Sequence, residues 1–96
     1  MIELNARQWK QLEEAGEIVQ EDGSVIRMLA LPIDKAEAKE INHCILREIM
    51  NDIELRNFDY KFRYKFFRHT AQFVFRGNRN VVDRYIYMAT SVSVGE

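Results

Sequence analysis

A chain of 96 residues in which 47% are hydrophobic and 30% are charged has an ordinary globular composition, which argues against an intrinsically disordered protein. Its length is that of one folding unit, so we expect a single domain over residues 1–96. No apolar run approaches the roughly 20 residues that a membrane-spanning helix needs, and we therefore expect no membrane partner.

The single cysteine, Cys44, cannot form an internal disulfide, and charged residues interrupt residues 1–15 too often for a signal peptide. Both observations predict a reducing compartment. We expect the cytoplasm, either of a bacterium or of an infected host cell. The small size and the lack of a catalytic motif suit an accessory or inhibitory protein of a phage or mobile element.

Charge is distributed unevenly along the chain, although the net charge is only -1. Residues 1–55 hold six Lys and Arg against twelve Asp and Glu, a net charge of -6, whereas residues 56–96 hold eight against three, a net charge of +5. Such a division indicates an interaction surface, or two halves that neutralise each other across the fold.

The first predicted helix covers residues 6–15. Asn5 suits the N-cap, and Gln8 stands at the third helical position, where it completes a capping box. Gly16 suits the left-handed residue that ends a helix. We expect Trp9 to lie in the core.

Residues 17–31 are predicted to form a β-hairpin. The dipeptide Asp22-Gly23 separates two β-prone runs and favours a two-residue type I′ turn. With that turn, Val19 would lie opposite Ile26.

A second helix is predicted over residues 35–53, because Asp34 suits an N-cap and apolar residues follow at helical spacing. The apolar stripe consists of Ala38, Ile41, Ile45, Leu46, Ile49, Met50 and Ile53. We expect this helix to lie across a sheet.

Residues 59–66 alternate between polar and aromatic side chains, which is the period of a half-buried strand. The aromatic side, expected to face the helices, consists of Tyr60, Phe62, Tyr64 and Phe66, and the basic side consists of Lys61, Arg63 and Lys65.

The alternation slips at Phe66-Phe67, where a β-bulge would restore it and leave Phe73 and Phe75 facing inward. A turn near His69 is the alternative, but the surrounding residues include no Gly, Pro or Asn.

We expect the chain to turn at residues 77–80 and to form a last strand over residues 81–94. The predicted fold is therefore α+β, with the element order α-β-β-α-β-β and two helices packed on one face of an antiparallel sheet. Helical spacing also fits residues 60–74 and 81–92, but aromatic and β-branched residues favour strands.

Cys44 and His69 are the only candidate pair of nucleophile and base, and a third, orienting group is missing. His43 and Cys44 point about 100° apart on a helix, so they cannot comfortably share a metal ion. We expect a non-enzymatic protein with no catalytic residue, no cofactor and no metal. A small enzyme that uses Cys44 and His69 is the last alternative.

The predicted outer face of the sheet combines basic side chains with exposed aromatic rings. Its candidate partner-binding residues are Lys61, Arg63, Lys65, Arg76, Arg79, Tyr85 and Tyr87. Such a face suits an acidic protein surface or a second copy in a homodimer. Single-stranded RNA or DNA is the second choice, and a solvated sheet face without a partner is the alternative to both.

Overall fold

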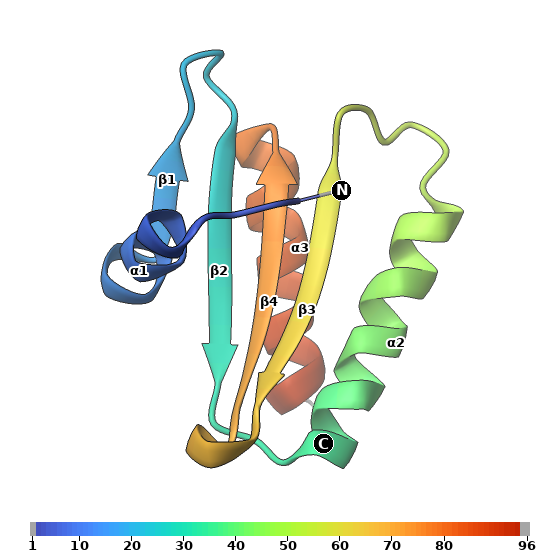
Figure 1. Ribbon diagram of the computed structural model, residues 1–96. Helices are drawn as coiled ribbons and strands as arrows, with labels where there is room; N and C mark the ends of the chain where they lie inside the picture. Colours follow the sequence, from blue (N-terminus) through green and yellow to red (C-terminus); the bar gives the residue numbers. More distant parts are fainter. Residues whose placement is uncertain (1, 95–96) are drawn as a thin grey trace.

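Across residues 2–94, which the computed structural model describes, four antiparallel strands form one sheet in the order β1-β2-β4-β3, with three helices on its two faces (Figure 1). The helices are α1 (Ala6–Ala15), α2 (Lys35–Asn51) and α3 (Arg79–Val94). The strands are β1 (Glu17–Val19), β2 (Val25–Leu31), β3 (Asp59–Lys65) and β4 (Thr70–Gly77). A short 3-10 turn, η1 (Phe66–Arg68), joins β3 to β4. The predicted α+β class is confirmed.

The predicted order α-β-β-α-β-β is confirmed as far as Gly77, but the prediction of a strand over residues 81–94 is wrong, because α3 occupies this region. The hairpin turn lies at η1, whereas at residues 77–80 the chain passes from β4 into α3 and not into a second strand. His69 closes this turn with a positive φ of 46°, and its amide donates a hydrogen bond to the Phe66 carbonyl at 3.2 Å. A positive φ is uncommon in residues other than Gly, although His is among those in which it is enriched, so the sequence carries only a weak signal for this turn.

Helix α3 forms because its buried residues recur at helical spacing. Val82, Tyr85 and Ala89 are almost completely buried, whereas a strand would place Val82 and Ala89 on opposite faces of the sheet. Asn78 starts the helix, since its side chain accepts a hydrogen bond from the amide of Asn80 at 2.9 Å.

The local signals at the other two helices are confirmed. The Asn5 side chain accepts from the Gln8 amide at 2.8 Å, and the Gln8 side chain accepts from the Asn5 amide at 3.0 Å. The Asp34 side chain caps α2 by accepting a hydrogen bond from the Glu37 amide at 2.8 Å. Gly16 ends α1 with a φ of 78°.

The hairpin of β1 and β2 is confirmed, but its register differs from the predicted one. Val19 lies opposite Val25 and not opposite Ile26, because the connection is a longer loop of residues 20–24. Within this loop the Asp22 carboxylate accepts a hydrogen bond from the amide two residues further on, at 2.9 Å. That contact stabilises the wider turn.

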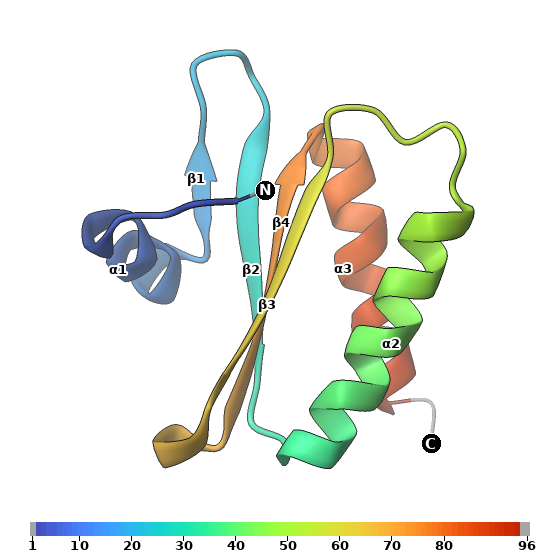
Figure 2. The ribbon, with the colours of Figure 1, turned by 45° about the vertical axis from the view of Figure 1, so that its right-hand side comes forward.

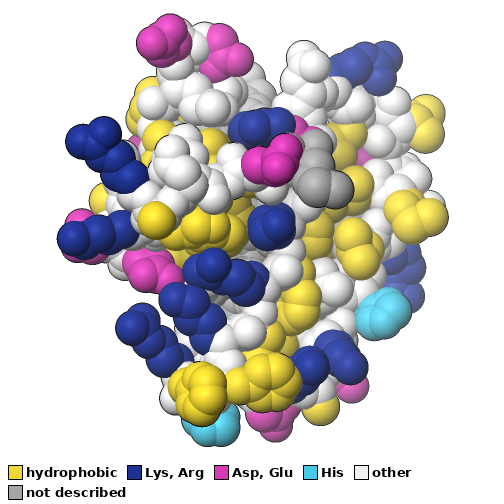
Figure 3. Space-filling model, viewed as in Figure 1, with side chains coloured by type: hydrophobic (Ala, Val, Ile, Leu, Met, Phe, Trp, Pro, Cys, Tyr) yellow, Lys and Arg dark blue, Asp and Glu magenta, His cyan; other side chains and the backbone are white. Residues whose placement is uncertain are grey.

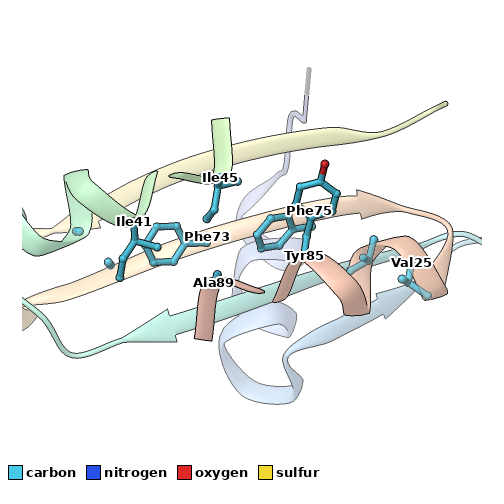
Figure 4. Close-up of a cluster of buried hydrophobic side chains, with 10 residues drawn as sticks. Val25, Ile41, Ile45, Phe73, Phe75, Tyr85 and Ala89 are labelled. Carbon is cyan, nitrogen blue, oxygen red and sulfur yellow. The ribbon is translucent and has the colours of Figure 1, made fainter. Parts of the chain in front are cut away.

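Two core clusters lie on opposite faces of the sheet (Figure 2). The larger one fills the space between the sheet and helices α2 and α3, and its labelled members in Figure 4 are Val25, Ile41, Ile45, Phe73, Phe75, Tyr85 and Ala89. The smaller one lies beneath α1 and consists of Ile2, Leu12, Ile26 and Val74.

Two helices do pack on one face of the sheet, but they are α2 and α3, whereas α1 was expected beside α2 and covers the other face (Figure 2). The reason lies in the two central strands, which carry apolar side chains on both faces. In β2 these are Val25 and Ile26, and in β4 they are Phe73 and Val74. Both faces must therefore be covered.

Candidate interaction surface

Strand β3 separates aromatic from basic side chains as predicted. Tyr60, Phe62 and Tyr64 pack against the larger core cluster. The Tyr60 hydroxyl donates to the Asn42 side chain at 2.6 Å, and the Tyr64 hydroxyl donates to the Ile33 carbonyl at 2.8 Å. Burial raises the pKa of Tyr60. The basic side chains of β3 therefore lie on the face that α1 covers.

Helix α1 binds two of these three basic residues. The Arg63 guanidinium lies 3.6 Å from the centroid of the Trp9 ring, a cation–π geometry. Lys65 donates to the Glu13 carboxylate at 2.6 Å, and Arg63 approaches the same carboxylate at 3.5 Å. Within residues 2–94, Lys61 forms no ion pair. The acidic half of the chain thus neutralises part of the basic half.

The contact between Glu13 and Lys65 predicts a pH-dependent contribution to stability. Hydrogen bonds from Lys65 and then from Gln72 lower the pKa of the Glu13 carboxyl. A lowered pKa gives a contribution that is present above the ordinary carboxyl pKa of about 4.3 and is lost as pH falls through the folded-state pKa.

We therefore expect Glu13→Gln to reduce the free energy of unfolding at pH 7 and to have a progressively smaller effect as pH falls below about 4. Urea denaturation of both proteins across that range measures the difference. Glu14→Gln, an exposed neighbour on α1, is the control. A Glu13→Gln effect that did not change with pH would contradict the assignment.

Arg76 and Arg79 each form an ion pair with a carboxylate other than that of Glu13. Arg76 pairs with Asp59 at the start of β3. Arg79 donates two hydrogen bonds to Glu17, at 2.8 and 3.1 Å. Both basic residues therefore connect elements of the fold. Because Arg76 lies opposite Asp59 in the register of β3 and β4, its side chain is on the same face of the sheet as the row of Lys61, Arg63 and Lys65. Arg79 lies in α3, outside this row.

The placement of Tyr85 and Tyr87 on a basic sheet face is wrong, because both belong to α3. Tyr85 is only 4% exposed, and its ring lies 5.0 Å from that of Phe58. Tyr87 is 76% exposed, on a helix that covers the opposite face of the sheet from α1. Neither ring can stack a ligand held by the basic side of β3.

Two other exposed aromatic rings lie at the tip of the hairpin between β3 and β4. Phe67 is completely exposed, at 102%, and Phe66 is 59% exposed. Phe66 packs edge-on against Tyr64 at 5.2 Å, and the Lys35 ammonium lies 4.5 Å from the Phe66 ring centroid. The inward orientation predicted for Phe66 is therefore wrong. Two adjacent Phe residues at the break in alternation were the signal, since both could not face the core.

Hydrophobic side chains gather at this tip, at the end of a line of basic ones (Figure 3). We call the combined patch the hairpin surface, which consists of Lys61, Arg63, Lys65, Phe66, Phe67 and Arg68. It brings basic and aromatic side chains together, as predicted, but with different rings.

An open cleft of about 410 Å³ lies between the end of α2 and α3. Asp52 dominates its polar lining, because its carboxylate accepts hydrogen bonds from Arg84 at 2.9 Å and from the Tyr85 hydroxyl at 3.4 Å. Burial and the nearby Asp52 raise the pKa of Tyr85. Asp52, Arg84 and Tyr85 thus satisfy one another, and Glu48 adds a second carboxylate to the lining of this cleft.

The structure does not bring Cys44 and His69 together as a pair. Cys44 lies in α2 and accepts a weak hydrogen bond from Arg47 at 3.6 Å, whereas His69 closes the η1 turn. Nowhere in residues 2–94 do three or more His, Cys, Asp or Glu side chains form a group that could hold a metal ion. Nor does the described part of the chain contain a helix with the length and apolar character to cross a membrane.

Comparisons with protein-family models, with curated proteins and with solved structures find no match to this chain. A functional assignment therefore depends on the geometry, exposure and charge of its surfaces. Among these, the hairpin surface combines the most exposed aromatic side chain with a row of cations.

Proposed function

We propose that this chain is a non-enzymatic binding protein that docks the hairpin surface onto an acidic surface of a partner protein. The observation that carries the proposal is the complete exposure of Phe67 at the end of the basic row. An aromatic ring that is entirely exposed to water gains the favourable free energy of burial only when a partner covers it. Aromatic and Arg side chains are also the residues that most often dominate binding energy at interfaces.

The positive charge around the tip of the hairpin between β3 and β4 favours an acidic partner. Lys35 lies against the Phe66 ring, Arg68 follows Phe67 in the same turn, and Lys61 is without an ion pair within residues 2–94. Such a positive surface attracts an acidic protein and speeds association. An accessory or inhibitory role in a reducing cytoplasm, in which binding is itself the function, fits this surface and the free Cys44.

Single-stranded nucleic acid is less well supported as the partner. The rings predicted to stack bases, Tyr85 and Tyr87, lie elsewhere, so stacking would depend on Phe66 and Phe67 alone. Glu13 also places a carboxylate among the basic residues of β3, where it would repel phosphate groups. This carboxylate favours a protein partner.

Replacement of Phe67 by serine is expected to weaken partner binding by about 30-fold, the equivalent of a hot spot of about 2 kcal/mol. The experiment captures proteins from a nuclease-treated cell lysate on the immobilised protein and then measures the affinity of the captured partner for each variant. Tyr87→Ser is the matched control, because it removes another exposed ring from a different element.

The proposal requires a protein that wild type and Tyr87→Ser retain and that Phe67→Ser loses. Retention of the same partner by Phe67→Ser would refute the proposed docking site. Loss of all captured material on nuclease treatment would replace the protein partner by nucleic acid.

A further inference from the structure

Strand β3 forms one edge of the sheet. Its hydrogen-bonded neighbour is β4, and within residues 2–94 no segment pairs with its outer side (Figure 2). An edge strand directs the N–H and C=O groups of alternate residues outward, where they are available to an added strand. The edge extends over seven residues, from Asp59 to Lys65, which is longer than a typical strand of five to six residues.

The two sides of this edge have different chemistry. On the side of α1 lie the basic side chains of Lys61, Arg63 and Lys65. On the side of α2 lie Tyr60, Phe62 and Tyr64, which are only half-buried.

Exposed apolar residues of α2 continue this second side. Asn42 holds the Tyr60 hydroxyl, so its face of α2 is turned toward β3. Leu46 and Met50 follow on the same face, four and eight residues later, and they are 41% and 82% exposed. Ile53, just beyond the end of α2, is 86% exposed. An apolar strip therefore lies next to the outer edge of β3.

We infer that β3 binds an extended acidic segment of the partner protein, which adds to the sheet as a fifth, antiparallel strand. Residues opposite each other in a sheet share a face. Acidic side chains of the segment therefore meet Lys61, Arg63 and Lys65, and apolar side chains that alternate with them cover Met50 and Leu46. This inference rests on the proposed function and specifies the form of the acidic partner, since strand addition supplies main-chain hydrogen bonds and alternate side chains supply specificity.

A second copy of the chain suits this edge less well than an acidic strand. If β3 paired with itself around Phe62, Lys61 would lie opposite the second copy's Arg63, and in the registers centred on Lys61 or on Arg63 that residue would lie opposite its own equivalent. Like charges directly opposite each other are destabilising. Asp59 would face Lys65 or Arg63 in two of these registers, but its carboxylate already pairs with Arg76. An acidic strand avoids the like-charge pairs altogether.

The test uses a blocked synthetic peptide in which three Glu alternate with Val, and its binding is followed by the amide NMR shifts of the whole protein. The comparison peptide has the same composition with its Glu and Val in separate blocks. We expect the alternating peptide to shift the β3 amides at concentrations up to about 1 mM, and the block peptide to bind at least about tenfold more weakly.

Two N-methylated forms of the alternating peptide test for strand addition itself. Because a strand bonds to β3 along one edge, methyl groups on one alternate set of amides should abolish binding, and those on the other set should be tolerated. Lys61→Glu and Met50→Glu are each expected to weaken binding about tenfold, whereas Tyr87→Glu on α3 should not change it.

Equal affinities for the two N-methylated peptides, equal affinities for alternating and block peptides, or no shift at about 1 mM would each overturn the inference. Shifts of the β3 amides caused by a single-stranded oligonucleotide and not by the peptide would overturn it as well. These outcomes leave the proposed function untouched, because the docking of Phe67 is tested separately with the captured partner.

Discussion

Replacement of Phe75 by alanine is expected to lower the free energy of unfolding by about 3–5 kcal/mol. The ring is completely buried, and its centroid lies 5.2 Å from that of Tyr60 and 6.3 Å from those of Phe58 and Tyr85. These rings come from β3, α3 and the loop before β3, so the substitution would leave a cavity where several elements meet. A domain of this size is stable by only about 5–15 kcal/mol. Equilibrium denaturation in urea measures the loss.

Phe67→Ala is the matched control, because it removes the same side chain from a site with 102% exposure. We expect its free energy of unfolding to lie within about 0.5 kcal/mol of wild type. If the two alanine variants lost similar stability, the assignment of Phe75 to the core and Phe67 to the surface would be wrong.

Replacement of Tyr87 by proline is expected to lower the free energy of unfolding by about 3 kcal/mol or more. The Tyr87 side chain is 76% exposed, so little packing is lost and the effect comes from the backbone of α3. Proline removes one helical N–H donor, and its ring clashes with the carbonyl four residues earlier. Urea denaturation followed by circular dichroism at the helical band measures both the stability and the helix content.

Tyr87→Ala separates the backbone effect from the side chain, and we expect it to change stability by less than about 0.5 kcal/mol, because alanine is the best helix former. A proline variant that lost less than about 1 kcal/mol would be incompatible with an interior helical position for Tyr87.

The elements that were predicted correctly are those whose sequence signals lie within a few neighbouring residues. The N-caps Asn5 and Asp34 and the left-handed Gly16 fixed the starts of two helices and the end of one. Each of these signals acts through a hydrogen bond between near neighbours in the chain, so it does not depend on the rest of the fold.

The C-terminal helix was missed because its sequence fits two periods. Val82, Ile86 and Met88 alternate with polar residues, yet Val82, Tyr85 and Ala89 also lie on one face of a helix. Whether this segment forms a strand or a helix depends on which of its residues can be buried in the core, and the packing of α2 and the sheet determines this. The turn at η1 was named only as the alternative to a β-bulge, because no Gly, Pro or Asn stands nearby, and in the structure His69 closes it in a left-handed conformation.

The basic row of the candidate site was predictable because a period of two separates the faces of any half-buried strand. The contacts that this row makes with other elements were not predictable from the sequence. The contacts of Arg63 with Trp9 and of Lys65 with Glu13 join residues about fifty positions apart, and they arise only because α1 packs on the second face of the sheet. Tyr85 was assigned to the candidate site only because residues 81–94 were predicted to form a strand, so it does not belong to the observed site.

The loop of residues 20–24 emerges from the end of the sheet opposite η1 and lies beside the edge strand β1, whereas β3 forms the other edge (Figure 1). A Cβ placed on Gly23 in this loop would meet nothing within 4 Å, although its φ of 89° suits glycine. Exposed loop tips of this kind tolerate insertions. An affinity tag inserted there would tether the protein to a surface, and a fluorophore inserted there would make the protein detectable. Either would leave both η1 and the outer side of β3 accessible to a partner.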